Sequence, residues 1–298
     1  MSTSELMSST ASTPDVGTAP SGTERPSAVA AFARLLRSEL RLVLRRRRNL
    51  AMLAVLACGP VLIGIAVRAA GEAEGGPPFL SEITGNGLFL VFTSLTVALP
   101  LFLPLTVAVV SGESLAGEAS TGTLRNLLAV PVGRVRLLAV KLLSVLTFGL
   151  VATLVIWASA VIVGLSLFPR GDMLLLSGSS VSLAEGLGRA LLVTLYVAAM
   201  LAGVAAIGVF VSTLTEVPMG AMAATAVLTI ITQIVGAVPQ VRVIWPYLFT
   251  APWFSYGDLL RTPVPGHDML VGLFTQLVYV AIFGALAWAR FTTKDVTS

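Results

Sequence analysis

Few side chains in this sequence could carry out chemistry on their own. Cys58 is the only cysteine among the 298 residues, and His267 is the only histidine. A single cysteine can form neither an internal disulfide nor a cysteine metal cluster, because both need partners. A single histidine cannot build a multi-histidine metal site, although it could serve alone as an acid or a base. The two residues therefore argue against a haem or metal enzyme.

Other motifs of catalysis and nucleotide binding are weak or missing. The sequence contains "GSS" at 178–180 and "HD" at 267–268, both in segments that we place outside the membrane. General acid–base catalysis needs a titratable group at the reacting atoms. The phosphate loop G-x-x-x-x-G-K-[ST] does not occur, so the chain does not bind ATP by that route. We predict no catalytic residue, no metal and no directly bound cofactor, and we do not expect an enzyme.

The composition is that of an integral membrane protein. Hydrophobic residues make up 56% of the chain and charged residues only 11%, with a mean hydropathy of +0.92. Soluble domains carry about 25% charged residues. The net charge of +4 does not indicate nucleic acid, because membrane proteins retain Lys and Arg in their cytoplasmic loops.

Six apolar segments are long enough to cross a bilayer, which needs roughly 20 helical residues. We therefore predict an all-α integral membrane fold whose six-span domain covers residues 49–290. The centres of the six segments contain no Asp, Glu, Lys, Arg or His, which argues against a proton-driven transporter. The predicted spans are 51–69, 88–110, 142–168, 190–214, 218–238 and 269–289.

Two different segments precede the first span. Residues 1–27 are rich in Ser, Thr, Pro and Gly, and we predict a disordered tail. Residues 28–48 place apolar side chains at helical spacing, with arginines on the other side, which predicts an amphipathic helix in the headgroup layer. A plain positive anchor would explain 45–48 equally well. The arginines of the predicted interfacial helix are Arg34, Arg37, Arg41 and Arg45.

The distribution of positive charge predicts the orientation. Fourteen of the 19 Lys and Arg residues lie before the first span, between the second and third spans, or after the sixth. Cytoplasmic loops carry this excess, so both termini, including a tail at 291–298, are predicted to be cytoplasmic.

The loop between the second and third predicted spans, which we expect to be cytoplasmic, is longer than a turn requires. Ser120 or Thr121 can cap a short helix whose leucines form an apolar side, and Pro131 with Gly133 can end it. Such a helix could fill a socket on a partner or pack on its own bundle, and the residues alone leave both alternatives open.

The loop resembles that between the second and third spans of type-2 ATP-binding-cassette permeases. The shared order is Glu118, Gly122, Thr123, Leu124, Leu127, Leu128, Pro131, Val132, Arg134 and Lys141. "GTLRNLLAVPVGR" is similar to the lantibiotic-immunity and bacitracin-resistance branch, and the similarity covers about 28–290.

The resemblance implies a coupling helix that docks on a separate ATPase subunit, where ATP and magnesium would bind. It also implies a second copy of the chain or a paralogous permease, and outward movement of a peptide antibiotic, a drug or a lipid-like molecule. The alternative is a membrane scaffold or sensor that recruits a soluble partner without transport. The implied coupling residues are Glu118, Thr121, Gly122, Thr123, Leu124, Arg125, Asn126, Leu127, Leu128, Pro131, Arg134 and Lys141.

Mild polar residues in the second and fifth spans could line a pathway, although threonines also bond back to their own helix. Pro100 and Pro104 are predicted to bend the second span, unless neighbouring helices accommodate them. The candidate pathway residues are Thr93, Thr96, Thr225, Thr229, Thr232 and Gln233.

Overall fold

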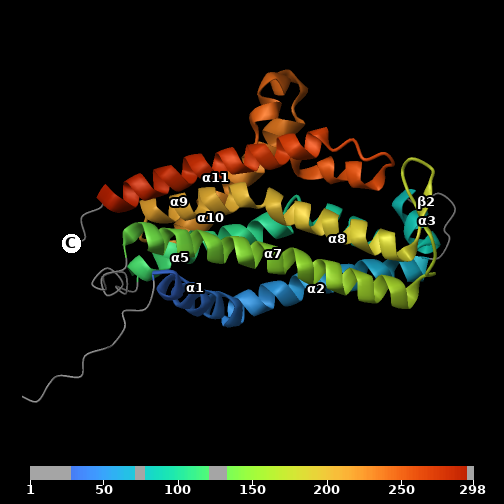
Figure 1. The fold of residues 1–298 in the computed structure, drawn as a ribbon, viewed down its shortest axis with the longest axis horizontal. Coiled ribbons are helices and arrows are strands. Elements are labelled where there is room, and N and C mark those ends of the chain that lie inside the picture. The colour runs from blue at the N-terminus through green and yellow to red at the C-terminus, as the bar shows by residue number, and fades with distance from the viewer. Residues whose placement is uncertain (1–27, 71–77, 121–132, 294–298) are drawn as a thin grey trace, which may run out of the picture.

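The computed structural model describes residues 28–70, 78–120 and 133–293. Long helices lie side by side along the longest axis of the molecule (Figure 1). Two strands of two residues each, β1 (Met173–Leu174) and β2 (Ser180–Val181), form a small antiparallel hairpin at one end. The helices are α1 (Ala28–Arg45), α2 (Arg47–Ala70), α3 (Pro78–Gly85), α4 (Phe89–Ala98), α5 (Phe102–Ser120), α7 (Arg134–Leu167), α8 (Leu183–Met200), α9 (Ala202–Leu214), α10 (Pro218–Ala237) and α11 (His267–Thr293).

The predicted all-α, multi-span character is confirmed. Five helical stretches among the described residues are long and apolar enough to cross a membrane, and the pair α4 and α5 makes a sixth if it counts as one span. The predicted fourth span consists of α8 and α9, which are separated by Leu201. The third span belongs to α7, a helix of 34 residues that begins at Arg134, before the predicted start at residue 142.

The amphipathic segment before the first span is a helix, as predicted, but it ends earlier. Helix α1 stops at Arg45, and α2 starts at Arg47. Val43 and Leu44 pack against the core, whereas the four predicted arginines are exposed. The helix itself is therefore confirmed, while its position in the headgroup layer stays a prediction.

The predicted bend in the second span is confirmed. Helices α4 and α5 meet at 53° across a break next to Pro100. A proline within α2, Pro60, leaves that helix continuous. The break thus lies where two prolines follow each other four residues apart, not wherever a proline occurs.

The core is centred on the helices in the middle of the sequence. Helix α9 is the most enclosed, with Gly203–Val209 buried throughout. A Cβ atom on Gly208 would come within 1.9 Å of the Ser111 hydroxyl oxygen, and one on Gly112 within 2.6 Å of the Met222 nitrogen. These glycines permit the close approach of α5, α9 and α10.

The segment between the last two long helices divides into two 3₁₀ helices. The first, η1 (Pro239–Tyr247), projects sideways from the bundle with all its side chains exposed (Figure 1). In the second, η2 (Ala251–Leu260), Trp253 and Tyr256 are buried. The aromatic residues of this segment therefore divide between an exposed projection and the core.

Candidate functional site

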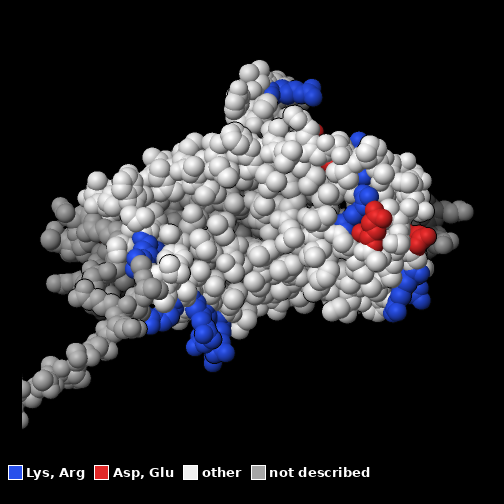
Figure 2. Space-filling model, viewed as in Figure 1, with Lys and Arg blue, Asp and Glu red and all other residues white. Residues whose placement is uncertain are grey.

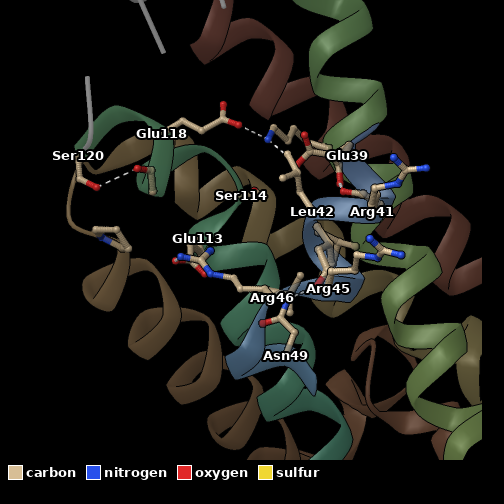
Figure 3. A pocket seen from close by; sticks show the side chains of 17 residues that line it. Glu39, Arg41, Leu42, Arg45, Arg46, Asn49, Glu113, Ser114, Glu118 and Ser120 are labelled. Atoms are coloured by element: carbon tan, nitrogen blue, oxygen red, sulfur yellow. Dashed lines mark hydrogen bonds and ion pairs between the residues drawn. The ribbon is translucent and has the colours of Figure 1, made fainter. Parts of the chain in front are cut away.

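The predicted coupling loop is bounded by two helices whose ends lie beside a cavity. This cavity, of about 650 Å³, lies between α1, the first turn of α2, the end of α5, the start of α7 and Pro218 of α10. Figure 3 shows Glu39, Glu113 and Glu118 around it, contributed by α1 and α5. Three acidic side chains in one cavity wall require cations nearby. The cations are Arg46 between α1 and α2, Arg48 in α2 and Lys141 in α7.

The first ion cluster consists of Glu39, Glu118 and Lys141, which we call the loop-base triad. The Lys141 Nζ lies 2.6 Å from a Glu39 carboxylate oxygen and also pairs with Glu118. The Lys141 side chain is only 3% exposed. A buried ammonium group is costly unless it is paired, so the two carboxylates account for its position. The triad joins α1, α5 and α7, and residues 121–132 connect the last two of these helices.

The second cluster joins the start of α2 to α5. The Arg46 guanidinium lies 2.7 Å from one oxygen of Glu113, and Arg48 pairs with the other oxygen. Buried Asn49 donates a hydrogen bond of 2.8 Å to the Val43 carbonyl, which lies in the last turn of α1. This bond satisfies a carbonyl where the α1 ladder ends, and it fixes the junction between α1 and α2.

A serine from α9 anchors the same part of α5. The Ser212 hydroxyl accepts hydrogen bonds from the backbone N–H groups of Leu115 (3.0 Å) and Ala116 (2.8 Å), and it donates to the Gly112 carbonyl (2.9 Å). The two N–H groups lie between Glu113 and Glu118, and Gly112 directly precedes Glu113. The end of α5 is therefore attached to the buried helix α9 as well as to the ion clusters.

Most of the predicted coupling residues lie outside the described part of the chain. These are Thr121, Gly122, Thr123, Leu124, Arg125, Asn126, Leu127, Leu128 and Pro131. Arg134 starts α7, but its side chain is not described. Glu118 and Lys141, at the two ends of the resembling motif, are brought together as an ion pair.

The predicted arginines of α1 fall into two groups. Arg41 and Arg45 border the cavity, and Figure 3 shows their guanidinium groups pointing away from the carboxylates of Glu113 and Glu118. Arg34 and Arg37 are exposed and do not border it. The arginines on this side of α1 therefore face outward, while Glu39 faces the bundle.

The candidate pathway threonines of α10 lie in helix packing. The Thr225 and Thr229 side chains are buried, and each hydroxyl donates to a carbonyl of its own helix at 2.8 Å. Thr232 also bonds within α10. This geometry favours the alternative in which the threonine hydroxyl groups form their hydrogen bonds within α10. That these residues line a transport pathway stays a prediction.

The other candidate pathway residues lie near the bend of the second span. Thr93 is half-buried, and the Thr96 hydroxyl lies 2.6 Å from the Tyr256 hydroxyl. Burial raises the pKa of the Tyr256 phenol, while the bond to Thr96 opposes that rise, so the phenol is neutral near pH 7. The Gln233 amide donates to the Pro100 carbonyl at 2.7 Å.

Sequence reasoning did not single out Glu39, Glu113, Arg46 or Ser212. Glu39 had a signal, because it follows Leu36 by three residues and precedes Val43 by four, on the apolar side of α1. An acidic residue on a buried stripe implies a cation opposite it. Glu113 and Ser212 had no comparable signal, because their partners depend on how separate helices pack.

Comparison with known families places the chain in one of them. The family described as "Protein of unknown function (DUF2705)" matches residues 61–297. The chain belongs to this family. The DUF2705 match includes Glu113, Glu118 and Lys141, whereas α1 and the first part of α2 precede it. No match was found among the curated proteins.

Proposed function

We propose that this DUF2705 protein is the transmembrane permease subunit of an ATP-driven exporter of the type-2 ABC class. It would lie in a bacterial cytoplasmic membrane with both termini in the cytoplasm, together with a second copy or a paralogous permease. A separate subunit would bind ATP and magnesium. The substrate would be amphipathic, such as a peptide antibiotic, a drug or a lipid-like molecule.

The loop-base triad is the observation that carries this proposal. A force applied to residues 121–132 acts on the end of α5 and the start of α7, which Lys141 links to each other and to α1. Ser212 extends the link to α9. A loop attached in this way can pass a push from a soluble partner to four helices, which is what coupling requires.

The arrangement of charge supports the proposed source of energy. On the face shown in Figure 2, charged side chains gather towards the two ends of the bundle and on the projecting η1 segment. Within the described helices, no Asp, Glu, Lys, Arg or His lies at the centre of a long apolar stretch. Ion- or proton-driven transport normally uses such a residue, so a partner that hydrolyses ATP fits this charge distribution better.

A crosslinking experiment tests the proposal. Cys58 is replaced by Ser, and a single cysteine is placed at Thr123 in the loop. A matched control places the cysteine at Ser177, which is exposed in the turn between β1 and β2. Both variants are crosslinked in native membranes, with and without ATP, and captured proteins are identified by mass spectrometry.

The expected result is capture from Thr123→Cys, and not from Ser177→Cys, of a soluble protein that carries a phosphate-binding loop. ATP should change the yield. If a folded Thr123→Cys chain with a reactive thiol captures no ATPase, the coupling proposal fails. Capture of a soluble partner without a nucleotide site would instead support the scaffold or sensor function.

A further inference from the structure

The two prolines of the second span leave the backbone carbonyls of residues 96 and 100 without their helical N–H donors. In an α-helix the carbonyl of residue 100 accepts from the N–H of residue 104, but Pro104 has no N–H. The ladder is intact on both sides, since Leu99 donates to Leu95 at 2.9 Å and Leu105 donates to Leu101 at 3.0 Å. The Pro100 carbonyl is therefore one of the two acceptors that the prolines leave open.

A side chain from another helix satisfies this carbonyl. Gln233, near the end of α10, donates its amide N–H to the Pro100 carbonyl at 2.7 Å. The surrounding side chains leave a cavity of only about 10 Å³, which is at the lower limit for one water molecule. The Gln233 amide is thus the donor that compensates for Pro104.

The other side of the break is held by the segment that follows α10. The Tyr256 hydroxyl of η2 lies 2.6 Å from the Thr96 hydroxyl, one turn before Pro100. Elsewhere α10 and α5 meet through small residues and through threonines that bond to their own helix. The polar attachment of α10 to the second span is therefore concentrated at the bend.

We propose that Gln233 and the Pro100 carbonyl form a latch that holds the second span in its bent form. When the hydrogen bond from Gln233 breaks, the Pro100 carbonyl has no donor within its own helix. The angle between α4 and α5 is then free to vary. Because α5 leads from this break to residues 121–132, the latch sets the direction of the helix that carries the loop. The proposal goes beyond the proposed function, because it concerns the isolated chain and needs no ATPase.

Restoring the missing N–H tests the latch. The variants are Q233M, which keeps an unbranched side chain without a donor, P104A, which supplies an N–H for the Pro100 carbonyl, and the double variant. All carry Cys58→Ser and spin labels at cysteines replacing Thr93 and Ser120, on either side of the break. The readouts are the distance distribution between the labels and the thermal midpoint in lipid nanodiscs.

We expect Q233M to broaden the distance distribution and lower the midpoint by a few degrees. P104A should lengthen the mean distance, because the second span straightens, and adding Q233M to P104A should change neither readout further. The matched control T232V removes a hydroxyl that bonds within α10, and its small effect should not depend on residue 104. Equal effects of Q233M with and without P104A would overturn the latch.

A second variant keeps the test decisive if P104A does not fold. A protonated carboxyl group at position 233 can donate to the Pro100 carbonyl, whereas the ionised group cannot. The Q233E variant should therefore show the narrow distance distribution at low pH and the broad one at high pH. A distribution that does not change with pH would contradict the latch.

Discussion

The Nζ atom of Lys141 lies 2.6 Å from a carboxylate oxygen of Glu39, which joins the start of α7 to the middle of α1. The same ammonium group pairs with Glu118 at the end of α5. These two pairs join α1, α5 and α7, and residues 121–132 connect α5 to α7 in the sequence.

Removing the cation of the loop-base triad should strongly destabilise the chain. Lys141→Met leaves the carboxylates of Glu39 and Glu118 facing each other without a cation. Because both carboxylates retain some solvent contact, we expect a loss of about 3 kcal/mol in the free energy of unfolding, at the lower end for buried pairs. Thermal unfolding in nanodiscs measures this loss.

The exchanged pair E39K with K141E provides the control. It keeps one acid and one base between α1 and α7, and it should recover part of the lost stability. If E39K/K141E is no more stable than K141M, charge pairing does not hold the triad together.

The second ion cluster should contribute less, because its cations are more exposed. The Arg46 and Arg48 side chains are 54% and 39% exposed, against 3% for Lys141. We expect Arg46→Gln to cost under about 1 kcal/mol, and added salt to reduce the difference from wild type. Thermal midpoints at low and high salt measure this, and a salt-independent loss as large as that of K141M would contradict it.

Ser212→Ala should loosen the end of α5. The substitution removes the acceptor of the Leu115 and Ala116 N–H groups in a buried position, at a cost of about 1–3 kcal/mol. Hydrogen exchange at residues 115 and 116 should become faster. Ser144→Ala is the control and should leave that exchange unchanged, because the Ser144 hydroxyl, among the described residues, bonds to the Lys141 carbonyl of its own helix.

The outward arginines of α1 should bind anionic lipid. Each basic residue near a negative membrane surface contributes about 1 kcal/mol, so replacing Arg34, Arg37, Arg41 and Arg45 together by Gln should reduce retention of anionic lipid markedly. Native mass spectrometry of purified protein measures the retained lipid. Arg261→Gln is a control for the loss of an exposed charge beside η2. If both variants retain the same amount of anionic lipid, the prediction is wrong.

Regular features of the fold could be predicted from the sequence. The long apolar segments and the helical period of residues 28–45 depend on local patterns, and the structure has the corresponding helices. The bend next to Pro100 was also predictable, because Pro104 removes a specific N–H. The donor that compensates for it was not, since Gln233 is 133 residues away in sequence.

The site was harder to predict because its contacts cross between helices. The sequence marked Glu118 and Lys141, but not that they pair with each other, and it gave Glu39 no role. Trp253 and Tyr256 have the composition of interfacial residues and yet lie in the core, since η2 folds back on α8 and α11. Composition alone does not distinguish these two environments.

The central proposal is that residues 121–132 bind a separate ATPase subunit. The most direct measurement is purification of the tagged chain from native membranes in mild detergent, with quantification of copurifying proteins for wild type, L127E/L128E and the control R170A at the hairpin end. We predict that an ATPase with a phosphate-binding loop copurifies with wild type and R170A, and is lost with L127E/L128E. Absence of an ATPase from wild type, or equal recovery with all three, would contradict the claim.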